Sequence, residues 1–229
     1  MNIFITGEDR RFEELRDKLM KDNFDIIRFD DAEEDIEELE TADVIFDLNF
    51  DDDASNLAVY ATLKDKIVFV SAVKNSLAEA LYLLDSKLKC KLFGMNALPT
   101  FLNRSRWEIS LHYKFHNQDL IDITSKLGVE YDTVEDRVGM VSPRILFMII
   151  NEACYTLQEG TAAVNDIDIA MKLGTNYPLG PFEWCDKIGI NEVFETLVAI
   201  YEDTKDERYK ICPLLKSKYL KNQPFYKLK

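Results

Sequence analysis

The sequence is short of cysteine, glycine, proline and positive charge. Its 229 residues include 4 cysteines, 8 glycines and 6 prolines. The cysteines lie far apart without the spacing of a metal site, so we predict reduced, buried thiols and no metal centre; they are Cys90, Cys154, Cys185 and Cys212. With 28 basic against 42 acidic residues, the net charge is -14. This balance argues against a nucleic-acid partner, because binding phosphates requires clustered Lys and Arg.

Long hydrophobic runs are also lacking. The longest, ILFMII at residues 145–150, is far too short to span a bilayer. The first residues, MNIFITGEDRRFEEL, show no basic region followed by a long apolar stretch, so we expect no signal peptide. These features predict a cytoplasmic protein with no membrane association.

Short β-branched and aromatic runs alternate with segments of helical spacing through the first half of the chain. The expected strands are 2–6, 24–29, 42–50, 66–73, 90–98, 106–115 and 129–136. The expected helices between them are 10–22, 30–43, 54–65, 76–85 and 116–128. This alternation predicts an α/β fold with a Rossmann-like, mostly parallel sheet and right-handed crossovers.

The second half shows helical spacing only. Helices are expected at 141–160, 166–174 and 189–205. We therefore predict two domains, an α/β domain over 1–137 and an all-helical domain over 138–229, which the chain length allows.

A rigid corner interrupts the helical half in VNDIDIAMKLGTNYPLGPFEW, residues 164–184. Gly174 stands where a left-handed residue would cap a helix, and Pro178 and Pro181 cannot extend one. The stretch therefore predicts a helix end followed by a tight turn.

The amino-acid sequence of this half resembles the C-terminal domain of the L-3-hydroxyacyl-CoA dehydrogenases over residues 137–190. The match rests on Asn151-Glu152-Ala153, on DIDIAMKLG at 166–174 and on the Tyr-Pro-x-Gly-Pro corner at 177–181. The resemblance implies a nucleotide-binding domain ahead of the helical one, and NAD-dependent oxidation of 3-hydroxyacyl-CoA in fatty-acid metabolism. It also implies an acyl-CoA-type ligand and a homodimer formed through the helical domain.

The family's catalytic histidine is replaced in this chain. The family segment Gly-x-His-Phe-Phe-Asn-Pro aligns with residues 94–100, which places Asn96 at the histidine and Glu108 at the glutamate that orients it. An amide accepts no proton near neutral pH, whereas imidazole does. His112 lies four strand residues beyond Glu108, about 13 Å away, too far to substitute.

The positions expected to bind NAD are degenerate as well. A dinucleotide fold needs G-x-G-x-x-G after its first strand, and residues 7–12 keep only Gly7. We favour a helix start capped by acidic residues over a pyrophosphate cradle there. Asp30 or Asp31 ends the second strand, either to hold a ribose hydroxyl or as part of a solvated face. Asp47 falls near a family glutamate after the third strand.

Two further family features are altered. Ser76 or Asn75 stands where the substrate-binding serine belongs, although a helix N-cap is the favoured role of Ser76. The helical hairpin that holds CoA is missing, and the acidic residues that replace it would repel CoA phosphates.

Three functions remain open on these residues. The first is a working dehydrogenase with a variant site. The second is a non-catalytic relative that acts as a dimerising or acyl-CoA-binding subunit; between these two we favour descent from the dehydrogenases with weak or absent catalysis. The third retains only dimerisation by the helical domain, while the α/β half binds an unrelated small ligand.

Overall fold

The computed structural model describes residues 1–20, 24–84 and 87–226 of two compact units, Met1–Met140 and Val141–Lys229. The expected helix ends at residues 21, 22 and 85, and the last three residues of the tail, lie outside the described residues. None of the helices in these ranges combines the length and the apolar character that a bilayer crossing requires.

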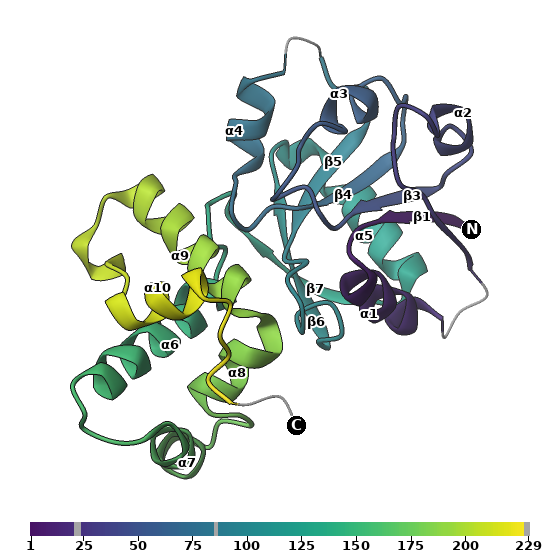
Figure 1. The fold of residues 1–229 in the computed structure, drawn as a ribbon. Coiled ribbons are helices and arrows are strands. Elements are labelled where there is room, and N and C mark those ends of the chain that lie inside the picture. The colour runs from purple at the N-terminus through teal and green to yellow at the C-terminus, as the bar shows by residue number, and fades with distance from the viewer. Residues whose placement is uncertain (21–23, 85–86, 227–229) are drawn as a thin grey trace. The chain divides into compact units, whose positions relative to one another are not determined.

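One sheet forms the centre of the first unit. Its described strands are β1 (Asn2–Thr6), β2 (Asp25–Arg28), β3 (Val44–Asp47), β4 (Ile67–Ser71), β5 (Lys91–Met95), β6 (Arg106–Leu111) and β7 (Glu130–Val134). They lie in the order β2-β1-β3-β4-β5-β6-β7, and every neighbouring pair is parallel except β5 with β6. The predicted α/β class with a mostly parallel sheet is confirmed (Figure 1).

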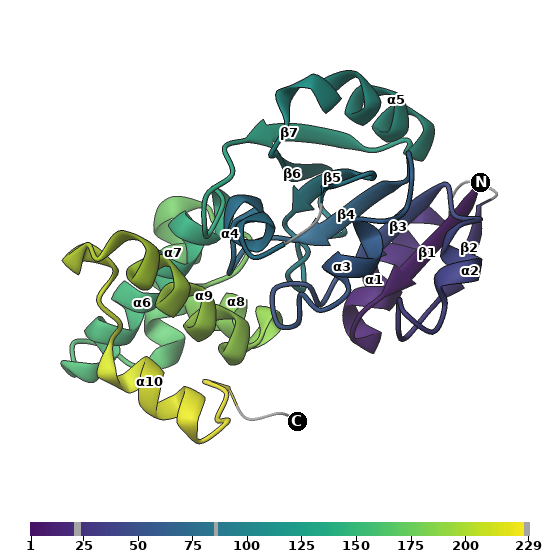
Figure 2. The same cartoon turned by 90° about the horizontal axis from the view of Figure 1, so that it is seen from above.

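Helices cover both faces of this sheet. The described helices are α1 (Asp9–Leu19), α2 (Ile36–Leu39), α3 (Leu57–Tyr60), α4 (Leu77–Tyr82) and α5 (Asn117–Leu127), with a 3-10 turn η1 (Lys114–His116). Helices α1 and α5 share one core cluster, in which Leu15 and Ile123 lie against Phe46, Phe69 and Phe93 of the strands. Figure 2 shows α5 running along one face of the sheet. Aromatic residues therefore bridge the central strands, where Phe46 and Phe69 stack at 5.1 Å.

Two helices of the first unit are shorter than the sequence pattern predicts. Helix α2 is one turn within the expected 30–43, and α3 is one turn within the expected 54–65. The acidic residues of 30–43 stand three and four positions apart, where like charges destabilise a helix. The Asp31 carboxylate also accepts the backbone N–H of Glu33 and Glu34, which forms a turn in place of a helix.

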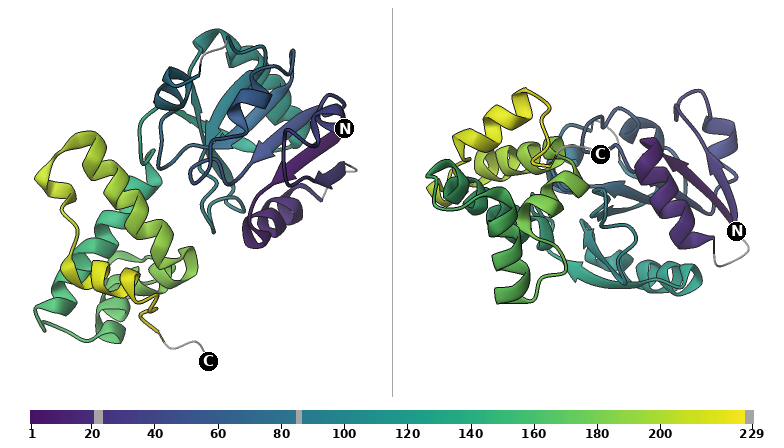
Figure 3. Two further views of the ribbon diagram at one scale, coloured as in Figure 1. Left: turned by 45° about the horizontal axis from the view of Figure 1, so that its top comes forward. Right: turned by 60° about the horizontal axis from the view of Figure 1, so that its bottom comes forward.

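The second unit is helical throughout its described residues. It contains α6 (Ser142–Gln158), α7 (Val164–Thr175), α8 (Pro181–Ile188), α9 (Ile190–Thr204) and α10 (Pro213–Leu220), with a 3-10 turn η2 (Glu207–Tyr209). Helix α6 packs against α8, α9 and α10, as Figure 3 shows. The predicted all-α C-terminal half is confirmed.

The predicted helix end and turn are confirmed, because α7 ends at Thr175, before Pro178 and Pro181. Two helices of this unit were not predicted: α8 begins at Pro181 and α10 begins at Pro213. Proline suits the first turn of a helix because its missing N–H has no partner there. Gly174 is not the left-handed cap: it lies inside α7, and Asn176 takes the left-handed conformation with φ 57°.

The four cysteines are free and buried, as predicted. Burial raises the pKa of Cys90 to about 12, and it raises the pKa of Cys154 and Cys185 as well. Thiols held protonated in this way are poor nucleophiles. The cysteines therefore serve as packing residues.

Candidate functional site

The carboxyl ends of β1 and β3 mark the point where the sheet order reverses. The chain passes from β1 to β2 on one side and continues from β3 on the other. In open α/β sheets this switch point forms the crevice that takes the ligand. The loop that begins at Gly7 and the loop that begins at Leu48 border it.

Gly7 fits the first position of a nucleotide loop, but its surroundings are filled. Its φ is 151°, and a Cβ added to it would lie 2.8 Å from the Cβ of Leu48. The next amide, of Glu8, donates to the side chain of Asn49 at 3.1 Å. Leu48 thus fills space beside Gly7, and Asn49 binds the Glu8 N–H, one of the amides that a pyrophosphate would need.

Two arginines beside this loop, the exposed Arg28 and the buried Arg11, bind groups of the chain itself. Arg28, the last residue of β2, donates to the Asp9 carboxylate at 2.6 Å and to the Gly7 carbonyl at 2.9 Å. Arg11 is fully buried and donates to the Leu48 carbonyl at 2.6 Å. Glu8 and Asp9 are exposed acids at the same helix start, and the Arg28 guanidinium pairs with Asp9. The residues present do not fit a dinucleotide pyrophosphate.

The predicted ribose acids follow Arg28 and do not end β2. Asp30 is exposed, and Asp31 uses one carboxylate oxygen to form the turn before α2. A guanidinium therefore stands at the strand end where a ribose-binding acid belongs in a dinucleotide fold.

Asp47 ends β3 inside the protein. It is 1% exposed, and it accepts hydrogen bonds from the Tyr60 hydroxyl at 2.9 Å, from Asn56 at 3.2 Å and from the Asn49 amide at 3.1 Å. Burial raises its pKa to about 6, and the hydrogen bonds oppose that shift. The carboxylate is engaged within the fold and is not directed at a ligand.

Asn96 and Glu108 lie side by side, as the alignment with the family predicted. They stand next to the antiparallel pair of β5 and β6, and the Asn96 amide nitrogen lies 3.5 Å from a Glu108 carboxylate oxygen. The backbone N–H of Asn96 also donates to the Glu108 carbonyl at 3.1 Å. Glu108 is thus placed beside residue 96 as the family's glutamate is beside its histidine, but the Asn96 amide has no basic nitrogen.

The two histidines lie at the far end of β6. His116 ends the 3-10 turn η1 just before α5 and contacts the Asp119 carboxylate at 3.1 Å, while His112 packs edge-on against Tyr113.

Ser76 caps helix α4, the alternative that the sequence favoured. Its hydroxyl accepts the Glu79 N–H at 3.1 Å, and the Glu79 carboxylate accepts the Ser76 N–H at 3.2 Å. This reciprocal capping box fixes the start of α4.

Sequence reasoning missed Asp51, a buried carboxylate that fills the loop after β4. It accepts the N–H groups of Val73, Lys74 and Asn75 at 2.6 to 3.2 Å and the Ser71 hydroxyl at 2.5 Å. Burial raises its pKa despite these hydrogen bonds. The DDD triplet at 51–53 was the available signal, but acidic runs usually lie at the surface.

The same loop is satisfied along its whole length. Asp136 accepts the N–H groups of Leu77 and Ala78 at 2.8 and 2.9 Å. Together with Asp51 and the capping box, seven consecutive amides from 73 to 79 donate to side chains of this chain. A ligand anion would have to displace one of these carboxylates.

The corner of the helical unit that resembles the family motif has a structural role. Asp168 on α7 accepts the N–H groups of Phe182 and Glu183 at 2.9 and 3.0 Å and the Tyr226 hydroxyl at 2.8 Å. Asn151 on α6 similarly binds the backbone of Lys210 and Cys212. The family-like residues therefore hold helices and tail together.

Comparison with known proteins agrees with this division of the chain. Residues 139–227 match the family model described as 3-hydroxyacyl-CoA dehydrogenase, C-terminal domain. A 3-hydroxybutyryl-CoA dehydrogenase of Bradyrhizobium diazoefficiens is 42% identical over 94 residues, which are 41% of this chain and 32% of the relative. The matched part thus spans about a third of the length of the curated relatives.

Solved structures extend the likeness to both units at low identity. The (S)-3-hydroxybutyryl-CoA dehydrogenase PaaH1 of Ralstonia eutropha aligns over 100% of this chain and 99% of its own, with a TM-score of 0.76 and 18% identity. FadB2 of M. tuberculosis aligns over 99% and 98%, with a TM-score of 0.79 and 14% identity. At such identity these structures establish the fold, and the predicted family resemblance is confirmed.

Proposed function

We propose that this chain, whose residues 139–227 match the C-terminal domain of the 3-hydroxyacyl-CoA dehydrogenases, is a relative of these enzymes with weak or absent catalysis. The observation that carries the proposal is the pair Asn96 and Glu108. The amide stands 3.5 Å from the acid, at the position that aligns with the family's histidine. Loss of a general base typically costs about 10²- to 10⁴-fold in rate.

The filled nucleotide loop supports the same proposal. Leu48 and Asn49 take the space beside Gly7, and Arg28 binds Asp9 instead of a phosphate. The exposed Glu8 carboxylate beside the loop would repel a pyrophosphate. The residues present around Gly7 therefore do not fit NAD.

The test is an assay with acetoacetyl-CoA and NADH, following the nicotinamide absorbance. We expect kcat/KM at least about 10²-fold below that of a family dehydrogenase measured in parallel. The melting temperature measured with each ligand separately distinguishes the open functions. We expect NADH to leave the melting temperature unchanged, and acetoacetyl-CoA to raise it if the chain binds acyl-CoA.

An Asn96→His variant is the matched control for that assay. Since it restores the imidazole but not the nucleotide loop, we expect it to stay inactive and to show no NADH-dependent rise in melting temperature. Turnover by the natural chain within the usual enzyme range of about 1 to 10³ per second would refute the proposal.

We also propose that the helical unit self-associates. Helices α6 and α7 carry exposed apolar side chains, namely Ile145, Ile169 and Leu173, and a cavity of about 380 Å³ lies between them. Exposed apolar patches of this kind mark interaction surfaces. We expect sedimentation velocity to give a dimer that Leu173→Glu weakens.

A Leu220→Glu variant on α10 is the control for that measurement, because Leu220 is similarly exposed on another helix. It should leave the dimer unchanged. A natural chain that stays monomeric at high micromolar concentration would contradict self-association.

A further inference from the structure

The sheet unit contains a cavity that neither the dinucleotide loop nor the Asn96–Glu108 pair uses. It has a volume of about 620 Å³ and lies between the loop after β3 and helix α4. Because α3 is a single turn, this part of the unit carries no long crossover helix between β3 and β4. A cavity of this size is in the range of small-molecule sites, about 300 to 1,000 Å³.

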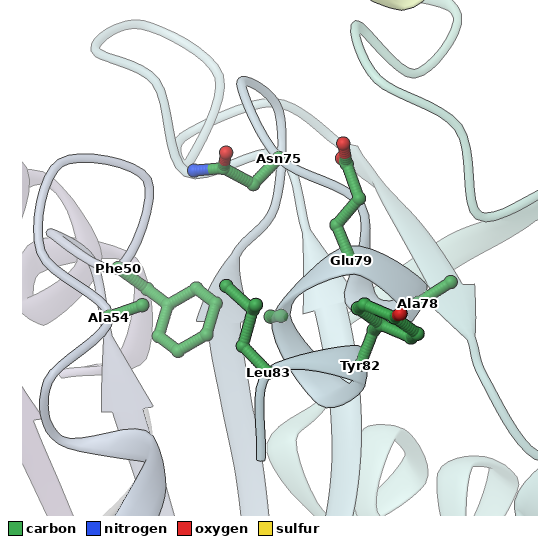
Figure 4. A pocket seen from close by; sticks show the side chains of 8 residues that line it. Phe50, Ala54, Asn75, Ala78, Glu79, Tyr82 and Leu83 are labelled. Atoms are coloured by element: carbon green, nitrogen blue, oxygen red, sulfur yellow. The ribbon is translucent and has the colours of Figure 1, made fainter.

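The walls of the cavity are apolar. Figure 4 shows Phe50 and Leu83 facing each other across it, with Ala54 and Tyr82 at its sides. Phe50 is buried and forms a rigid wall, whereas Leu83 is 82% exposed and Tyr82 is 88% exposed. Large apolar groups left so exposed beside a cavity favour an occupant that covers them.

At one end of the cavity lie an amide and a carboxylate, those of Asn75 and Glu79. Asn75 uses its side-chain nitrogen to donate to the Asp51 carbonyl at 3.0 Å, which leaves its amide oxygen as an acceptor. Glu79 uses Oε2 in the capping box with Ser76. Its Oε1 and the Asn75 amide oxygen accept no hydrogen bond from the described residues.

The charge at this end selects the ligand class. No Lys, Arg or His lines the cavity within the described residues, and the lining carboxylate is that of Glu79. The nearest lysine of the loop, Lys74, is bound to Asp52 at 2.6 Å. An anionic ligand would meet the Glu79 carboxylate and no lining cation, whereas an ammonium group would find two open oxygens.

We propose that this cavity binds small aromatic or branched apolar molecules that carry a protonated amine. The apolar body lies between Phe50 and Leu83, and the ammonium group donates to Glu79 and Asn75. This site is separate from the proposed dehydrogenase-like site, and its test involves neither NADH nor acyl-CoA.

The test compares three probes of one shape by calorimetry and by NMR of the labelled full chain. Tryptamine is the cation, 3-ethylindole the neutral analogue and indole-3-propionate the anion. We expect tryptamine to bind about tenfold or more tightly than indole-3-propionate, with amide shifts centred on Phe50 and Leu83.

Two variants localise the effect. Glu79→Gln keeps a capping box, since glutamine serves in that position, and should abolish the preference for the cation. Ala54→Phe places a ring at the exposed rim and should weaken all probes, whereas Ala58→Phe, exposed on α3 outside the lining, should not. Equal binding of cation and anion, no binding at millimolar tryptamine, or amide shifts elsewhere would overturn the proposal.

Discussion

Replacing Gly180 by alanine should destabilise the protein by about 4 kcal/mol or more. A Cβ at this position would lie 2.2 Å from the Cγ and 2.3 Å from the Cβ of Asp168, too close for any rotamer adjustment. Asp168 is 1% exposed and accepts hydrogen bonds from Phe182, Glu183 and Tyr226. Hydrogen bonds to a charged acceptor contribute about 1.5 to 3 kcal/mol each. Moving Asp168 would weaken all of them.

Urea unfolding of the full chain, followed by circular dichroism, measures this effect, and Gly174→Ala is its control. Gly174 lies inside α7, and an added Cβ would meet nothing within 4 Å. Alanine should therefore stabilise α7 by about 0.5 to 1 kcal/mol. If Gly174 were the left-handed cap that the sequence suggested, its alanine variant would instead lose stability, and comparable losses at both glycines would refute this account.

The fold could be predicted where local pattern and tertiary burial agree. The strands of the parallel sheet are continuous apolar runs because both of their faces are covered, and α6 has a long apolar face. The pattern failed where proline begins a helix, as at Pro181, because the same residue also ends helices. It failed again at α2, where helical spacing was present but like charges oppose the helix.

The candidate site could be predicted only through its alignment with the family. Asn96 and Glu108 are 12 residues apart, and only the antiparallel pairing of β5 with β6 brings them together. Asp51 was missed because its role depends on amides that lie 20 or more residues away in the sequence. An acidic run carries no local sign that one of its members is buried in such a nest.

Carboxylates of the chain occupy several positions at the carboxyl edge of the sheet where a nucleotide fold leaves room for ligand anions. Asp51 and Asp136 satisfy the loop before α4, and Asp47 is buried at the end of β3. Buried carboxylates cost stability unless hydrogen bonds compensate for lost hydration. The arrangement should therefore leave a measurable dependence of stability on pH.

Asp47→Asn should stabilise the protein at pH 7.5 by about 2 kcal/mol relative to the natural chain. Burial raises the pKa of Asp47 from 3.8 to about 6. Between these pH values the folded protein keeps a proton on Asp47 that the unfolded chain has lost, so the free energy of unfolding falls as the pH rises from 3.8 to about 6. The full effect of ionising Asp47 is about 3 kcal/mol. An asparagine whose carbonyl oxygen takes the place of Oδ2 avoids the charge and still accepts from Tyr60 and Asn56, but its NH2 group then faces the Asn49 N–H, so it recovers only part of this effect.

The measurement is the difference in unfolding free energy between variant and natural chain from pH 4 to pH 7.5. We expect the advantage of Asp47→Asn to be small near pH 4 and to grow as the pH rises toward 7. Asp53→Asn is the control: the Ser55 amide lowers the pKa of this exposed acid, so its loss should slightly destabilise the chain at neutral pH and matter less in acid. The stability difference between Asp47→Asn and the natural chain could instead stay constant, or fall, as the pH rises. That outcome would show that the Asp47 carboxylate ionises at little cost, and it would contradict the view that buried carboxylates at the carboxyl edge of the sheet cost stability.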